Sequence, residues 1–238
     1  MAYRNFKFSV GEYYHLYNRG VDKRSIFVDD HDRNRLAYLM HLSNGDRSFD
    51  IQKVFREYEI SEIFKIDTGK PLVSICAWVF MDNHFHILAK EIVDGGISRF
   101  MKNLCGSYSK YFNIKHDRTG ALFEGRFKAQ HVDTDIYLKY LFAYIHLNPI
   151  KMLAGASHWK EEGIKDLPQA KVFLQCYTYS SLIDFLKPKS RFYDALISKK
   201  AAPEYFPGPV SVWREINEWL KFVDVGTPQR SKMNQKQI

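Results

Sequence analysis

Cysteine is scarce in this sequence, and long apolar runs are absent from it. The 238-residue chain contains three cysteines, Cys76, Cys105 and Cys176, which are widely separated. An odd number at such spacing matches neither a disulfide framework nor a zinc ribbon, so a reducing cytoplasm is the simplest interpretation. No apolar run approaches the length of a membrane span, and the first residues lack the apolar segment of a signal peptide. We therefore expect no membrane partner.

Motifs of several common enzyme classes are also absent. The chain has no Walker A loop and no His-Glu-x-x-His sequence, so nothing supports an NTPase or a zinc protease. The phosphoesterases that use two histidine motifs need a second His-x-Ser/Thr pair. The pair His15-x-Tyr17 does not supply it.

Basic residues exceed acidic ones. The chain carries 35 Lys and Arg against 27 Asp and Glu, a net charge of +8, and its hydrophobic fraction of 45% is that of an ordinary globular protein. The excess favours a polyanionic partner, nucleic acid before membrane.

The periodicity of apolar residues predicts an α+β protein. Strands are expected at 12–19, at 72–80, in the histidine-containing segment after a turn at 81–83, and at 122–132 with an interruption at Gly125. Helices are expected at 29–42, at 94–113, and from Asp133 or Thr134 to just before Pro149. This order indicates an antiparallel sheet with helices on one face. We predict a domain over 1–155 with an excursion at about 43–70, a helical C-terminal extension over 156–225, and a disordered tail over 226–238.

Two histidines in one predicted strand are candidate metal ligands. His84 and His86 flank Phe85, and alternate strand residues share a face, so both imidazoles should point the same way. Two neutral imidazoles on a rigid face form half of a divalent-metal site. Alone the pattern is weak, since histidine also has ordinary structural uses.

A second segment strengthens the case for a metal site at His84 and His86. Tyr144 and Asn148 are four residues apart in a predicted helix, so they should be neighbours. Tyr144 could attack a phosphate, and the Asn148 oxygen could complete a shell that suits Mn²⁺ or Mg²⁺ better than structural zinc. The competing interpretation is an aromatic stripe in the core, with Asn148 as a helix cap. The proline after Asn148 also disfavours a helical conformation there.

Three ordered motifs resemble the signatures of one family. They are WVFMDNHFHIL at 78–88, RTGALFEGRFK at 118–128 and YIHLNPIK at 144–151. They resemble the single-tyrosine HUH transposases, and among these the REP-associated tyrosine transposase branch. The opening segment HLYNRG at 15–20 is similar to the first strand of that group. The resemblance covers roughly residues 10–155, with an echo at 179–182.

The resemblance implies a ferredoxin-like catalytic domain that cuts and joins single-stranded DNA beside hairpins. It implies that His84, His86 and Asn148 hold Mg²⁺ or Mn²⁺, and that Tyr144 becomes linked to the DNA 5′-phosphate. Such a protein would act in a bacterial cytoplasm near the nucleoid, as a monomer or homodimer. The excursion and the long C-terminal region depart from the simplest members of the family.

Basic side chains are candidate DNA contacts. We expect Arg118, Arg126 and Lys128 to lie near the active centre and bind phosphates, together with Arg19 of the opening strand. A basic stripe that includes Lys102 is either a second contact or a solvated helix face. One alternative for the whole chain is a domesticated protein that binds hairpins without transposition. Another is a metal-dependent phosphodiesterase that uses water.

Overall fold

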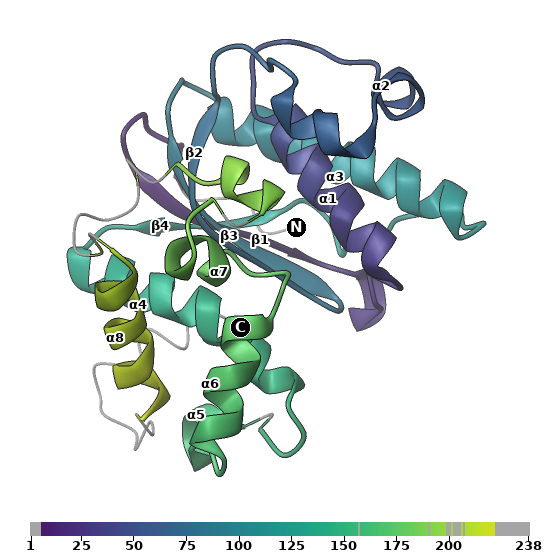
Figure 1. Ribbon diagram of the computed structural model, residues 1–238. Helices are drawn as coiled ribbons and strands as arrows, with labels where there is room; N and C mark the ends of the chain where they lie inside the picture. The colour runs from purple at the N-terminus through teal and green to yellow at the C-terminus, as the bar shows by residue number, and fades with distance from the viewer. Residues whose placement is uncertain are drawn as a thin grey trace.

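A four-stranded antiparallel sheet forms the centre of the molecule. The computed structural model describes residues 6–156, 158–189, 191–198, 201, 206 and 208–221 (Figure 1). The strands are β1 (Tyr13–Arg19), β2 (Val73–Met81), β3 (His84–Glu91) and β4 (Lys128–Val132). Their spatial order is β2-β3-β1-β4, and all neighbours are antiparallel. The predicted α+β class is confirmed.

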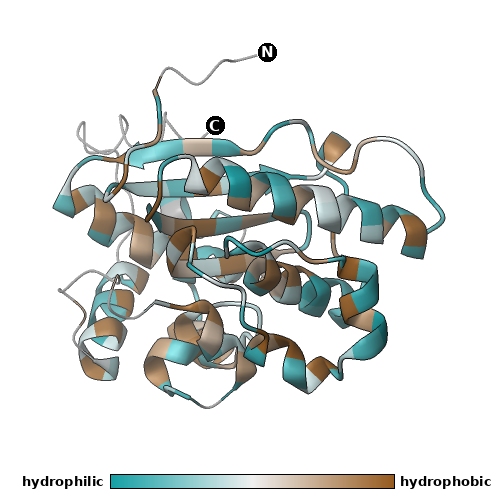
Figure 2. Ribbon diagram, turned by 90° about the horizontal axis from the view of Figure 1, so that it is seen from above, coloured by the Kyte–Doolittle hydropathy of each residue, from teal (hydrophilic) through white to brown (hydrophobic). Residues whose placement is uncertain are grey.

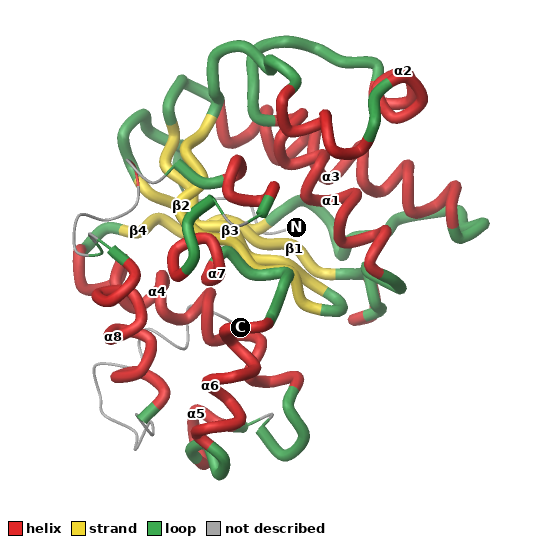
Figure 3. The backbone as a smooth tube through the Cα atoms, in the orientation of Figure 1, coloured by secondary structure: helices red, strands yellow, loops and turns green. Residues whose placement is uncertain are grey.

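Helices cover both faces of this sheet, whereas the sequence suggested one (Figure 3). Helix α3 (Gly96–Lys115) packs against α1 (Asp30–Ser43), and its Tyr108 ring lies 6.4 Å from Phe123, which contacts Phe85 of β3. Helix α4 (Asp135–Leu147) lies on the opposite face, where its Tyr144 ring approaches His86. Neighbouring residues of a strand point to opposite faces, so Phe85 and His86 separate the two layers.

Local sequence signals explain the helix bounds. The Asp29 carboxylate accepts a hydrogen bond from the Asp32 backbone N–H at the start of α1, and the Thr134 hydroxyl accepts one from Tyr137 at the start of α4. Figure 2 shows hydrophobic and hydrophilic residues alternating along the helices, as expected of helices with one buried side.

The predicted excursion is an ordered insertion with a small core. It contains α2 (Ile51–Glu57) and the 3₁₀ helix η2 (Ile60–Lys65). Leu42, Val54 and Ile63 form a cluster separate from the main core. The insertion therefore carries its own apolar contacts at the end of α1.

The C-terminal region is helical, as predicted. It comprises α5 (Trp159–Glu162), α6 (Leu167–Cys176), α7 (Leu182–Leu186), the 3₁₀ helix η4 (Phe192–Leu196) and α8 (Pro209–Leu220). The main core contains residues from this region as well as from the sheet. The tail predicted to be disordered, 226–238, lies outside the described residues.

Residues of this region also line the free edge of β2. Phe80 donates its backbone N–H to the Tyr179 carbonyl at 2.9 Å, and Ser181 donates its own to the Trp78 carbonyl at 3.0 Å. Ser198 donates similarly to Ile75 at 2.9 Å. These bonds satisfy strand groups that would otherwise be unpaired. The C-terminal region therefore closes one edge of the sheet.

Candidate active site

The sheet register gathers polar side chains on the face that α4 covers. His84 pairs with Arg19 of β1, and His86 pairs with Tyr17. Lys128 of β4 pairs with Tyr17 from the other side. Directly paired residues point to the same face, so these five side chains form one surface across β3, β1 and β4.

The two histidines lie side by side on that surface. Their ring centroids are 4.9 Å apart. His84 Nδ1 lies 2.6 Å from Asn83 Oδ1, and His86 Nδ1 lies 2.8 Å from Nε2 of His15. Hydrogen bonding at Nδ1 is how proteins usually orient metal-binding histidines, because it leaves Nε2 to the ligand. The rings of His84 and His86 are both held through Nδ1.

Helix α4 brings Tyr144 next to the histidines, with Asn148 one turn further on. The Tyr144 ring lies 5.7 Å from His86 and 6.3 Å from His15. Asn148 keeps helical angles (φ −52°, ψ −40°), and its N–H bonds to the Tyr144 carbonyl. The chain continues past Pro149 as the 3₁₀ helix η3 (Asn148–Met152). The proline therefore does not break the alignment of the two side chains.

Burial controls the protonation of this site. Burial raises the pKa of Tyr144 above its ordinary value, and the adjacent Asn148 carboxamide acts in the opposite direction. Burial lowers the pKa of His84 to about 4, and the positive charges of Lys151 and Arg19 add to the effect. At neutral pH the phenol therefore keeps its proton and the His84 imidazole is neutral. A neutral imidazole can donate its lone pair to a metal ion.

The donor set fits a hard or borderline divalent metal. Asn148 is 1% exposed, and neither polar atom of its side chain makes a hydrogen bond of ordinary geometry to the described residues. A buried carboxamide without such a bond is costly, and a ligand at this point would relieve the cost. The described ranges contain no group of three or more His, Cys, Asp or Glu that could hold a metal, and Asn148 is the candidate for a third protein ligand beside the two histidines.

Basic side chains surround the histidine pair. Arg19 Nε lies 2.8 Å from Glu124 Oε1, and the charges of Arg19, Lys128 and Lys23 lower the pKa of the Glu124 carboxyl. Arg126 is exposed in the segment between Glu124 and Lys128. This end of the sheet therefore brings several cations close to the Glu124 carboxylate.

Two other predicted DNA contacts lie elsewhere. Arg118 contacts Phe112 and Asn113 of α3, with Nη1 3.3 Å from Asn113 Oδ1 and the guanidinium 5.7 Å from the Phe112 ring. Lys102 is exposed on α3. Helix α3 packs on the sheet face opposite the histidines. The structure thus puts Arg19 and Lys128 on the histidine face, leaves Arg118 and Lys102 on the α3 side, and shows Arg126 as exposed in the segment before Lys128.

Tyr140, one turn before Tyr144, has different surroundings. Its ring lies 5.2 Å from Trp219 of α8 and 6.0 Å from Tyr144, and the residue is 7% exposed. Tyr144 is half-buried and stands next to the histidines. The geometry therefore favours Tyr144 over Tyr140 as a nucleophile.

His15, Tyr17 and Lys151 belong to this site although the sequence analysis gave them no role there. The signal for the first two was the alternation His15-Leu16-Tyr17 in the opening strand, which puts both side chains on one face. Only the strand register reveals that this face is also that of His86. Lys151 is the last residue of the tyrosine motif at 144–151, and its charge lowers the pKa of His84.

His146, in the middle of the tyrosine motif, faces away from this site. It is fully buried, and its Nε2 lies 2.7 Å from the Ser181 hydroxyl. The same hydroxyl accepts a hydrogen bond from the Trp78 N–H at 2.9 Å. His146 thus connects α4 to the segment that closes the β2 edge.

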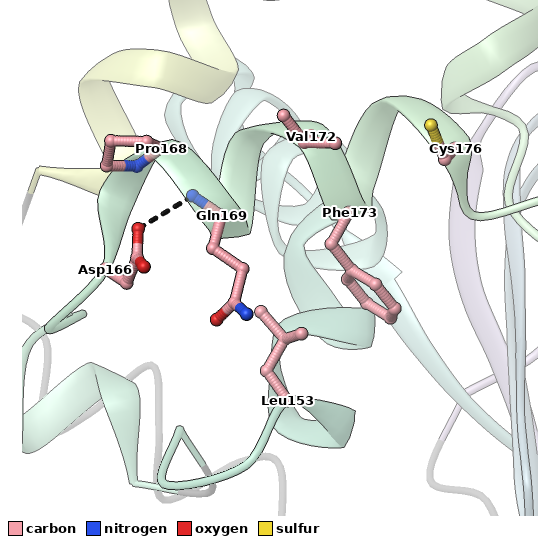
Figure 4. A pocket seen from close by; sticks show the side chains of 7 residues that line it. All are labelled: Leu153, Asp166, Pro168, Gln169, Val172, Phe173 and Cys176. Carbon is pink, nitrogen blue, oxygen red and sulfur yellow. Dashed lines mark hydrogen bonds between the residues drawn. The ribbon is translucent and has the colours of Figure 1, made fainter.

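A separate apolar groove lies between η3 and α6 (Figure 4). Its lining consists of Leu153, Asp166, Pro168, Gln169, Val172, Phe173 and Cys176. The one carboxylate among them, Asp166, accepts the Gln169 N–H at 2.8 Å and caps α6. This groove has no cluster of reactive groups.

Comparison with known proteins identifies the family of the chain. The sequence model of the family described as "Transposase IS200 like" matches residues 9–148, which is more than half of the chain. The protein belongs to this transposase family. No curated protein matches the sequence. Among solved structures, the chain is similar to a REP-associated tyrosine transposase bound to a REP hairpin, with 17% identity, a TM-score of 0.47, and coverage of 82% of this chain and 90% of the other.

Proposed function

We propose that this protein cleaves and rejoins single-stranded DNA near hairpins through a covalent bond between Tyr144 and a DNA 5′-phosphate. One observation carries the proposal. The Tyr144 ring lies 5.7 Å from His86 on the sheet face where His84 and His86 are neighbours, and Asn148 is one helical turn further on. Membership of the IS200-like family supports a reaction on DNA.

The proposed step conserves atoms and bonds. The Tyr144 oxygen attacks the phosphorus, the bond from phosphorus to the DNA 3′-oxygen breaks, and the phenolic proton is balanced by the proton on the new 3′-OH. One phosphoester replaces another, so rejoining requires no external energy source. Because burial raises the pKa of Tyr144, the proton must leave as the new bond forms.

His84, His86 and Asn148 would hold the Mg²⁺ or Mn²⁺ ion that we include in this proposal. Such an ion, when bound, polarises a non-bridging phosphate oxygen. The chain supplies the orientation, since helix α4 fixes Tyr144 and Asn148 on one side and strand β3 fixes the histidines on the other. Fixed placement of the attacking atom near the phosphate is itself a large part of catalysis.

The DNA would enter along the cationic end of the sheet. Arg19 and Lys128, which share the histidine face, and the exposed Arg126 would contact phosphates there, whereas Lys102 and Arg118 would contact only DNA that also reaches the α3 side. In the described ranges no helix combines the length and apolarity needed to cross a bilayer. Action in the cytoplasm near the nucleoid, as a monomer or homodimer, remains part of the proposal.

The test is covalent trapping. The full chain is incubated with a hairpin-bearing single strand and Mn²⁺, and the product is separated on a denaturing gel and mapped by peptide sequencing. We expect a DNA adduct at Tyr144 that is lost in Tyr144→Phe, while hairpin binding and the fold persist. Tyr140→Phe is the matched control, because it removes the hydroxyl one turn earlier on the same helix, and it should still form the adduct.

Other outcomes identify the alternatives. Hairpin binding without any cleavage by the wild-type chain would indicate a DNA-binding protein that has lost the chemistry. Cleavage without an adduct would indicate a phosphodiesterase that uses water. An adduct at Tyr140 would overturn the assignment of the nucleophile.

A further inference from the structure

A line of three polar side chains crosses the sheet from β4 to β3 and ends at a proposed metal ligand. His15 of β1 lies diagonal to His86 and directly opposite Gln130 of β4. The bond between His15 Nε2 and His86 Nδ1 is 2.8 Å long, and the two rings stack with centroids 4.9 Å apart. His15 is 2% exposed. A buried histidine therefore supports another histidine.

The outer end of this line has complementary groups in place. In the described part of the chain, His15 Nδ1 and Gln130 Oε1 are buried and have no hydrogen-bond partner. Directly opposite residues of an antiparallel pair have Cβ atoms about 5 Å apart, within reach of a small rotation or one water molecule. An imidazole N–H and a carboxamide oxygen are a donor and an acceptor, so the two unmatched groups suit each other.

The chemistry fixes where each proton lies. If His86 presents Nε2 to a metal, its proton is on Nδ1, which donates to His15 Nε2. His15 must then carry its own proton on Nδ1, the atom on the Gln130 side. All three side chains stay neutral, and each imidazole carries its one N–H proton on Nδ1.

We propose that His15 is a positioning residue that holds His86 in the tautomer with Nε2 directed to the metal, and that Gln130 orients His15 in turn. This inference rests on the proposed function, because it assigns support to one of its metal ligands. His84 has a local equivalent in Asn83. The two ligands would thus be oriented by different elements, a turn for one and a neighbouring strand for the other.

The experiment measures the dissociation constant for Mn²⁺ by calorimetry on the full chain without DNA. His15→Phe keeps a ring of similar size but removes the acceptor, and His15→Gln places a polar atom near the position of Nε2. Loss of a hydrogen-bonding partner of a metal ligand typically weakens metal binding about 10- to 100-fold, which we expect for His15→Phe. His15→Gln should restore most of the affinity. His131→Phe, the same change on β4 at a histidine paired with Glu12, is the control and should have no effect.

A second measurement follows the tautomer directly. The ¹⁵N spectrum of the metal-free wild-type protein should show His86 protonated at Nδ1, and His15→Phe should populate the other tautomer. Gln130→Met should shift both readouts in the same direction by a smaller amount. If His15→Phe does not fold, Gln130→Met tests the proposal in its place.

The outcomes separate this inference from the proposed function. Wild-type affinity for Mn²⁺ in folded His15→Phe, or in Gln130→Met when the former is unfolded, overturns the inference and leaves the metal site standing. Absence of Mn²⁺ binding by the wild-type chain overturns both. If His15→Phe and His15→Gln weaken Mn²⁺ binding equally, ring packing matters and the hydrogen bond does not. This result would also overturn the inference.

Discussion

Replacement of Ser181 by alanine should destabilise the protein far more than a surface serine would. The Ser181 hydroxyl makes three hydrogen bonds, the number a hydroxyl can make. It accepts from the Trp78 N–H and from His146 Nε2, and it donates to the Trp78 carbonyl at 3.2 Å. Ser181 and His146 are both fully buried. In Ser181→Ala the Trp78 N–H and the His146 ring nitrogen each lose a partner, and water cannot replace it.

The magnitude follows from those two groups. A buried polar group left without a partner costs about 1–3 kcal/mol, so we expect a loss of roughly 3–4 kcal/mol in the free energy of unfolding. For a chain of this size that corresponds to a fall in Tm on the order of 10 °C. Urea denaturation followed by circular dichroism measures the first quantity, and calorimetry the second.

Ser180 provides a matched control. It is 1% exposed and adjacent, and its hydroxyl accepts one hydrogen bond, from the Leu182 N–H at 3.2 Å. Ser180→Ala leaves only one buried N–H without a partner and should therefore cost about 1–2 kcal/mol. The reasoning fails if Ser181→Ala costs no more than Ser180→Ala. The double variant His146→Phe/Ser181→Ala should lose less free energy of unfolding than the two single variants added together, because both changes remove the same contact.

Three further predictions concern acid, metal and DNA. Burial lowers the pKa of His146 to about 3 against 6.5 in the unfolded chain, so the stability it contributes is complete above pH 6.5 and is lost as pH falls towards 3. His146→Phe should flatten the pH dependence of the free energy of unfolding between pH 4 and 6 by about 1.4 kcal/mol per pH unit, and His31→Asn, at an exposed position, should not. Asn148→Ala should weaken Mn²⁺ binding about tenfold or more in calorimetry while leaving hairpin affinity measured without metal nearly unchanged; equal Mn²⁺ affinity would remove Asn148 from the ligand set. Lys128→Ala should lower the slope of log affinity against log salt for a single strand by about 0.7, and the same loss in Lys102→Ala would show that the DNA also reaches α3.

Sequence periodicity predicted the elements that carry the site. The strand with His84 and His86 and the helix with Tyr144 lie where alternation and capping placed them, because both signals are local. The bounds differ only slightly, for example Gly96–Lys115 where 94–113 was expected. One strand was predicted too long. A strand interrupted by Gly125 was expected over 122–132, but regular pairing begins only at Lys128, and Gly125 itself has φ 154°.

Other features depended on contacts between distant segments. The placement of α4 on the face opposite α3 follows from tertiary packing and not from the order of elements, so the expectation of helices on one face was too simple. The role of His15 required the register of β1 against β3. Helix α6 was not predicted as a separate element, although Asp166 and Pro168 form a recognisable start.

The closed edge of β2 limits how this protein can be shortened. The family match ends at residue 148, so a truncated protein with all proposed catalytic residues is an obvious choice for expression. Such a protein would lose the partners of Phe80, Trp78 and Ile75 and expose an apolar strand whose backbone groups can pair with another copy. We expect it to self-associate. The C-terminal region, which lies outside the family match, would then keep the protein soluble by covering β2. In shorter relatives another segment or a partner would have to cover the corresponding strand.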